Sequence, residues 1–335
     1  MSASSTGGTW AVSDFLSERE LAISASDPST FYQELDEVLG SLSIHAHTAF
    51  GSELDDQPAG ETCFFRGQSS ATWGLSSSLY RLYEDRFASG YVSEAAEQAL
   101  ANAERQVLET ARANGIVRGL TGLERLTILQ HHGAPTRLVD VSTDWRVALY
   151  FACEERDAED GRLFVISTCP KRWTDFRKPL NDDQSLVWWD KQRLKGLDWK
   201  QSVWPVLLPF TDSRMVAQRG YFLVGGLTSD RGGHHFYHGR SKKNAPLSNA
   251  EMRRVSSLAI EFPNVFDSLG LQAATQKFLK RRPKSKWTAS AITIRIPASI
   301  KPGIRGLLAK QGVSRDDIYP PVAETTRLLK HVAAE

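Results

Sequence analysis

The segment Leu129–Ala152, LQHHGAPTRLVDVSTDWRVALYFA, holds the densest group of polar and charged residues in this chain. A helix is expected to end at Gly133, because glycine commonly terminates helices. A second helix is expected from about Thr143, with apolar positions through Phe151. The connection Ala134–Thr136 therefore holds polar side chains between two packed helices. Such an arrangement builds either a ligand site or a structural ion-pair cluster.

Five polar residues of this segment are candidates for either role. Thr136, Arg137 and Asp140 lie just after a proline kink, where they either shape a pocket or lock the turn between the helices. His131 and His132 point about 100° apart on a helix, so only one of them can face a given ligand. One imidazole is then a candidate general base, and the alternative is a structural histidine.

A second dense stretch, Phe64–Gln68, is expected to be a buried strand. Arg66 is followed directly by Gly67, where backbone N–H groups are open, and a guanidinium there suits a phosphate or carboxylate. The alternative is an Arg66 that pairs with an acid such as Asp140. Gln68 either orients a ligand amide or satisfies turn backbone.

A third stretch repeats this combination of a basic residue, an amide and a glycine on an apolar strand. A strand is expected over Val216–Gly225, with Arg214, Gln218 and Gly220 at or near its start. If this strand neighbours the Phe64–Gln68 strand, their polar residues converge on one cleft.

These stretches together resemble the FRG domain family. Its pattern reads F-R-G-Q, W-x-L-x-P-S-L-x-R, then Q-H-x-G-x-P-T-R-L-L-D-W-T-x-N-P-x-x-A-L-Y-F-A, and its later R-x-x-A-Q-x-G-x-F strand is similar to Arg214–Phe222. Ser77 stands in place of the usual Pro, Val141 in place of Trp, and Asp144–Trp145 in place of Asn-Pro. The resemblance extends over about residues 60–325 and implies a fold, but no settled activity.

The 335 residues, 41% hydrophobic with nine tryptophans, are sufficient for a large core. Helical patterns come early and strand patterns late, which favours an α+β fold. We expect a mixed or antiparallel sheet core with flanking helices in a single large domain. The expected divisions are a helical N-terminal extension (1–59), an FRG-like domain (60–325) and the end of a C-terminal helix (326–335).

The composition limits the cellular locations and the binding partners that we expect. A net charge of +2 gives no global attraction to nucleic acid. Three cysteines without metal or disulfide spacing are typical of a reducing compartment, and no secretory or membrane-spanning pattern is present. We expect a soluble cytoplasmic protein without a membrane partner. No metal is predicted, because no acid or cysteine completes His234-His235-x-x-His238.

The order of residue types is also similar to that of ADP-ribosyltransferase folds, in which an early-strand Arg or His and a late-strand Glu or Gln flank nicotinamide. This similarity implies NAD as cofactor, transfer or release of ADP-ribose, and a macromolecule as candidate acceptor. Arg66, His131 or His132, and Gln218 would be catalytic, whereas Gln68, Thr136, Arg137, Asp140 and Arg214 would bind the ligand. Because Gln218 cannot act as a base, binding of NAD without turnover is an alternative.

Two further alternatives place function elsewhere. The segment 277–287 is basic with aromatic edges, and Lys280, Arg281 and Arg282 could track phosphates in a non-catalytic nucleic-acid-binding module. The same run is also an ordinary solvated helix face. In the remaining alternative, the stretches that resemble the FRG family form only a structural core and the protein acts through partners.

Overall fold

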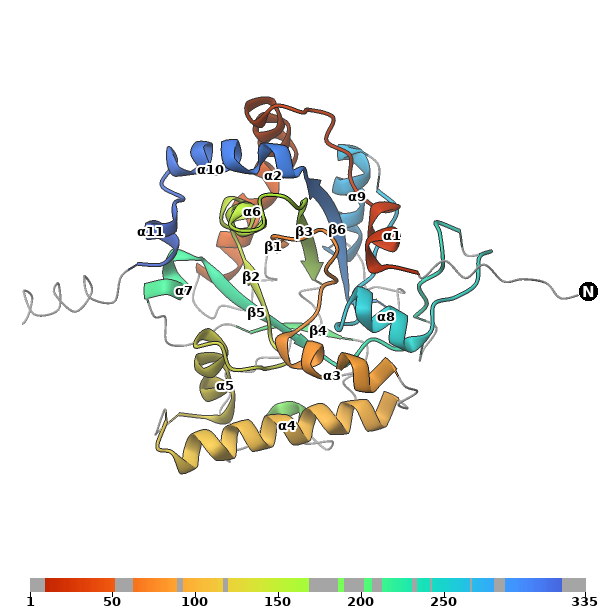
Figure 1. The fold of residues 1–335 in the computed structure, drawn as a ribbon, viewed down its shortest axis with the longest axis vertical. Coiled ribbons are helices and arrows are strands. Elements are labelled where there is room, and N and C mark those ends of the chain that lie inside the picture. Colours follow the sequence, from red (N-terminus) through yellow and green to blue (C-terminus); the bar gives the residue numbers. More distant parts are fainter. Residues whose placement is uncertain are drawn as a thin grey trace, which may run out of the picture.

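The structure is a computed structural model. It describes residues 10–51, 63–88, 93–116, 120–168, 186–189, 202–206, 213–230, 234–241, 243–265, 267–279 and 287–320. Within this part of the chain, helices surround one curled sheet of six strands, with α2 and α10 at one end and α3, α4 and α5 at the other (Figure 1). The α+β prediction is confirmed.

The sheet is antiparallel throughout and has the order β4-β5-β2-β1-β3-β6. The side chains along each strand point alternately into two apolar layers, because successive side chains of a strand point to opposite faces of the sheet. Phe65 and Val165 lie in the layer under α2, α6 and α10, while Phe64 and Phe164 lie in the opposite layer with α1 and α8. The strands are β1 Cys63–Gln68, β2 Val139–Ser142, β3 Gly161–Thr168, β4 Val203–Val206, β5 Gly220–Gly225 and β6 Ala289–Ile296.

Local capping signals begin several of the helices. The Thr121 side chain accepts from the Glu124 backbone N–H at 3.4 Å, and the Glu124 carboxylate accepts from the Thr121 backbone N–H at 2.8 Å. The spacing Thr121-x-x-Glu124 is the sequence pattern of a capping box. The helices are α1 Val12–Ser17, α2 Pro28–Gly51, α3 Ser78–Ala88, α4 Ser93–Ala113, α5 Gly122–His131, α6 Trp145–Cys153, α7 Ser213–Ala217, α8 Asn249–Val255, α9 Ser268–Leu279, α10 Lys301–Ala309 and α11 Arg315–Ile318, with 3₁₀ turns η2 Val187–Trp189 and η5 Ala298–Ile300.

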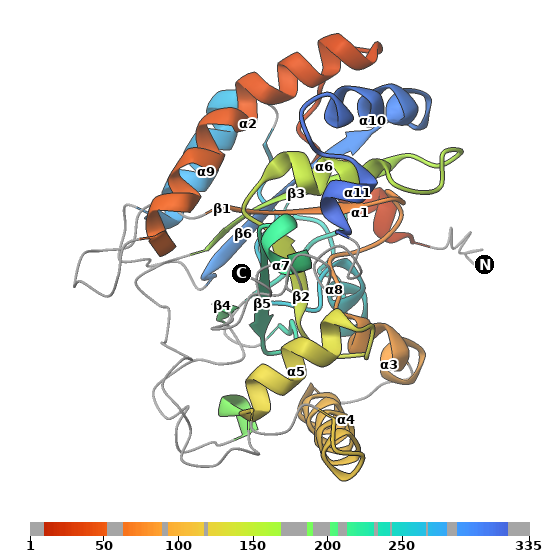
Figure 2. The ribbon, with the colours of Figure 1, turned by 90° about the vertical axis from the view of Figure 1, so that its left-hand side faces the viewer.

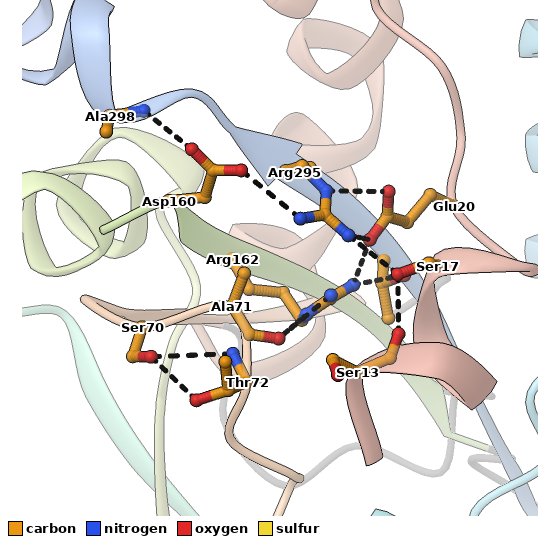
Figure 3. A network of polar contacts seen from close by, with 11 residues as sticks. Ser13, Ser17, Glu20, Ser70, Ala71, Thr72, Asp160, Arg162, Arg295 and Ala298 are labelled. Atoms are coloured by element: carbon orange, nitrogen blue, oxygen red, sulfur yellow. Dashed lines mark hydrogen bonds and ion pairs between the residues drawn. The ribbon is translucent and has the colours of Figure 1, made fainter. Parts of the chain in front are cut away.

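A polar network ties the N-terminal segment to the sheet (Figure 3). The Glu20 carboxylate accepts from Arg295 on β6 and lies 2.7 Å from the buried Arg162 guanidinium on β3. Arg162 also donates to the Ala71 carbonyl at 2.9 and 3.0 Å, which anchors the loop after β1. Val12 packs in the core layer of α8. Residues 10–21 therefore belong to the same packed body as the strands.

Gly67 brings β1 and α6 into direct backbone contact. A Cβ on Gly67 would lie 1.7 Å from the Ala148 carbonyl oxygen and 2.6 Å from the Ala152 nitrogen. Only glycine fits at such a close approach of two backbones. The residue after Arg66 therefore contacts α6 of the same chain.

The predicted strand Val216–Gly225 begins later than expected. Residues Ser213–Ala217 form α7, Gln218 lies in the following turn, and β5 starts at Gly220. Arg219 has φ 45°, a left-handed conformation that interrupts an extended strand. Gln218 is therefore held by a turn at the entrance to β5.

Among the described residues, no helix has the length and apolar character needed to cross a membrane.

Candidate functional site

A cavity of about 630 Å³ opens where β1 and β2 separate. β1 pairs with β3 along its whole length, but with β2 only at Phe65 and Ser142. Ala148 and Phe151 of α6 and Arg214 and Met215 of α7 also line the cavity. Figure 2 shows α6 and α7 near these strands. The polar side chains that line this first cavity are Arg66, Gln130, His132, Asp140, Ser142, Arg214 and Gln218.

Arg66 spans the opening between the strands. Its Nη1 donates to the Asp140 backbone carbonyl at 2.6 Å and lies 3.6 Å from the Asp140 carboxylate. The Arg66 side chain is 17% exposed and that of Asp140 57%, so water screens the acid more than the cation. Burial lowers the pKa of Arg66, and the Asp140 charge offsets this only in part. Arg66 Nε is buried without a hydrogen-bond partner. This guanidinium is thus incompletely neutralised.

A hydrogen-bond chain positions the Asp140 carboxylate. Gln130, near the end of α5, donates from Nε2 to Asp140 Oδ2 at 2.9 Å. Its Oε1 accepts from the buried Thr136 hydroxyl at 2.6 Å, which sets the orientation of the amide. Thr136 therefore acts on the cavity through Gln130 and does not line it.

The opposite wall comes from α7 and the turn before β5. Arg214 lies over the ring of Tyr319 at 4.7 Å, and its Nε is buried without a partner. Gln218 donates from Nε2 to the Ile318 carbonyl at 3.3 Å. The Ser142 hydroxyl donates to the Gln218 carbonyl at 2.8 Å and ties this turn to the end of β2. Both walls of the cavity are therefore linked at Ser142.

The described side chains that line the first cavity carry more positive than negative charge. Arg66 and Arg214 contribute two guanidinium groups and His132, exposed just after α5, contributes an imidazole, while Asp140 is the one carboxylate among the described lining residues. Guanidinium groups bind carboxylates and phosphates in bidentate fashion. The cavity therefore suits an anionic ligand.

Residues 61–161 match the FRG domain family. The chain carries an FRG domain. No curated protein and no solved structure matches the chain.

Each residue of the Phe-Arg-Gly sequence that opens the FRG domain has a separate task. Phe65 packs in the core layer of α6, Arg66 lies across the cavity, and Gly67 permits the contact with α6. The match to the FRG domain includes Arg66, His132 and Asp140 but ends before Arg214 and Gln218. The cavity is thus completed by a segment beyond the matched region.

Arg137 lies away from the cavity, although it precedes Asp140 by only three residues. Its buried guanidinium donates to Glu104 at 2.6 Å and to Glu97 at 2.9 Å, both on α4. Burial alone would lower the pKa of Arg137, but these two carboxylates raise it. Trp188 and Trp189 also donate to Glu104. Arg137 therefore ties the connection before β2 to α4, and both lie within the matched region.

Of the remaining predicted site residues, one lines another cavity and the others lie outside the part of the chain that the structure describes. Gln68 lines a second cavity, described below, and its Nε2 donates to the Gly74 carbonyl at 3.1 Å. The side chain of His131 lies outside the described residues, as do Lys280, Arg281 and Arg282. No cluster of three or more His, Cys, Asp or Glu suited to a metal ion occurs in the described ranges.

Sequence reasoning missed Gln130, Ser142, Met215 and Tyr221 as lining residues. Gln130 stands directly before the two histidines in the motif Q-H-x-G and was the one with a signal, since a motif amide at a helix end is often turned toward a site. Tyr221 is on a predicted strand whose two faces could not be assigned without its neighbours.

Proposed function

We propose that the first cavity binds NAD and that the protein transfers or releases ADP-ribose. The observation that carries this proposal is the convergence of Arg66, Arg214 and His132 with the Asp140 carboxylate in one cavity. Its volume, about 630 Å³, is in the range of ligand pockets. The Arg66 guanidinium suits the negative charge of the pyrophosphate, and the Asp140 carboxylate suits the positive nicotinamide ring.

The reaction breaks the bond between the ribose C1′ and the nicotinamide nitrogen, and the electron pair of that bond stays on the nitrogen. Positive charge develops on the ribose, and the Asp140 carboxylate, held by Gln130, stabilises it electrostatically. Water or an acceptor hydroxyl then bonds to C1′, and its proton passes to the His132 imidazole. Gln218 contributes hydrogen bonds to the ribose and takes no proton.

Nicotinamide release by the purified full-length protein tests the proposal. Arg66→Ala removes the guanidinium that spans the cavity, and we expect release to fall at least about 10-fold, the effect of one lost charge-assisted hydrogen bond. Arg66→Lys should recover only part of the activity, because an ammonium cannot form the bidentate contact. Arg112→Ala, an exposed arginine on α4, controls for net charge.

The outcomes separate binding from chemistry. Equal, background-level release by wild type and Arg66→Ala would rule out the enzymatic proposal. NAD affinity, measured by calorimetry on the same samples, would then decide between binding without turnover and no binding at all.

A further inference from the structure

A second cavity of about 550 Å³ adjoins the first. The two share Arg66, Gly67 and Phe151 as lining residues, so they meet at the end of β1. The second cavity extends from there along the loop after β1 toward α3 and α8. Its other lining residues include Gln68, Trp73, Arg81, Glu84 and Arg254.

Two guanidinium groups converge where the cavities meet. Burial lowers the pKa of Arg81, and the nearby positive charge of Arg66 lowers it further. Arg81 donates to the Ser76 carbonyl at 2.7 Å, and it makes no ion pair within the part of the chain that the structure describes. Arg66 is the incompletely neutralised cation of the first cavity. The Asp140 carboxylate, 3.6 Å from Arg66, is 57% exposed and offsets these charges only in part. A bound anion would stabilise the two desolvated like charges further.

The wall of the second cavity is built before any ligand arrives. Gln68 is 6% exposed, and its Oε1 is buried without a hydrogen-bond partner. The loop that carries Thr72 and Trp73 is anchored by Arg162 through the Ala71 carbonyl (Figure 3). Trp73 is 42% exposed at the rim and offers an aromatic ring to a ligand. Glu84, the one acid among the described residues that line the second cavity, is paired with Arg254 at 3.0 Å.

We infer that the ligand is a pyrophosphate-bridged dinucleotide that lies across both cavities, with its phosphates on Arg66 and Arg81 and its second nucleoside in the second cavity beside Trp73. This inference rests on the proposed function, which places the reacting nicotinamide ribose near Asp140 in the first cavity. The phosphates of such a ligand lie between two nucleosides. Arg66 likewise lies between the two cavities, and Arg81 lines the second cavity with it. The adenosine half then occupies the second cavity.

Calorimetric binding to the full-length protein tests the inference, with ADP-ribose and nicotinamide mononucleotide as probes. Arg81→Ala should weaken ADP-ribose at least about 10-fold, since a charged hydrogen-bond donor is lost. Arg254→Glu places a negative charge in the second cavity at an exposed position and does not depend on the packing of Arg81. It should weaken ADP-ribose several-fold and change nicotinamide mononucleotide less than twofold. Arg112→Ala should change neither.

Wild-type affinity for ADP-ribose in both Arg81→Ala and Arg254→Glu would overturn the inference. So would equal losses of both probes in Arg254→Glu, because the second cavity would then not be selective for the adenosine half. Nicotinamide release is measured on the same proteins. If both variants release nicotinamide with an unchanged KM for NAD, the proposed function is retained, but the inference that the ligand lies across both cavities is refuted. If ADP-ribose binding depends on Arg81 but no nicotinamide is released, the inference that the ligand lies across both cavities is supported and the proposed reaction is refuted.

Discussion

Replacing Gly67 on β1 by alanine should strongly destabilise the protein, although it adds only one methyl group. The new Cβ would lie 1.7 Å from the Ala148 carbonyl oxygen, and real Cβ contacts are not shorter than 3.0 Å. Both neighbours are backbone atoms, so no side chain can rotate away. α6 would have to move by about 1 Å or more, and overpacking of this kind costs roughly 3 kcal/mol or more.

The same movement should also open the first cavity, because Ala148 and Phe151 of α6 line it. The assay is urea denaturation followed by circular dichroism, together with NAD affinity of the folded protein. Gly306→Ala on α10 is the matched control, since nothing lies within 4 Å of the Cβ it would add. We expect that control to gain about 0.5–1 kcal/mol from helix propensity. A Gly67→Ala protein within 1 kcal/mol of wild type would refute the packing argument.

Three other predictions concern single side chains. Arg137→Met should lower the free energy of unfolding in urea by about 3–5 kcal/mol, because Glu104 is left as an uncompensated buried charge. The double variant Arg137→Met/Glu104→Gln should recover part of this loss. Loss of NAD affinity in the folded variant without loss of stability would contradict this structural role. Gln218→Glu places a carboxylate in the first cavity and should raise nicotinamide release about 10-fold or more if the missing acid limits turnover; unchanged release shows that it does not. Burial raises the pKa of Cys153 to about 12, so the native thiol stays protonated while the unfolded one ionises. Stability should then fall above about pH 9 by up to ~1.4 kcal/mol per pH unit, and Cys153→Ala should lessen that fall, whereas parallel pH profiles would contradict the assignment.

Local signals in the sequence predicted much of the secondary structure. Thr121 and Glu124 form their capping box from neighbouring atoms of one helix end, so no distant contact is needed. The strand expected over Phe64–Gln68 is likewise present, as β1. The strand expected from Val216 was wrong at its start, because the left-handed conformation of Arg219 follows from the tertiary setting of that turn, where its side chain pairs with Asp144 at 2.7 Å.

The residue types of the candidate site were readable in the sequence, but their partners were not. Arg66 and Arg137 are both arginines of the motifs, and for Arg66 the sequence offered an acid such as Asp140 as a candidate partner. Asp140 lies 74 positions after Arg66 and meets it only because β1 and β2 become neighbours and then diverge. Glu104 reaches Arg137 only because α4 packs against the connection after α5. A sequence determines which side chains can carry charge and which local turns form, since those depend on adjacent atoms. Which charge faces a cavity and which is enclosed by a carboxylate depends on contacts between distant segments, and the tertiary structure alone decides them.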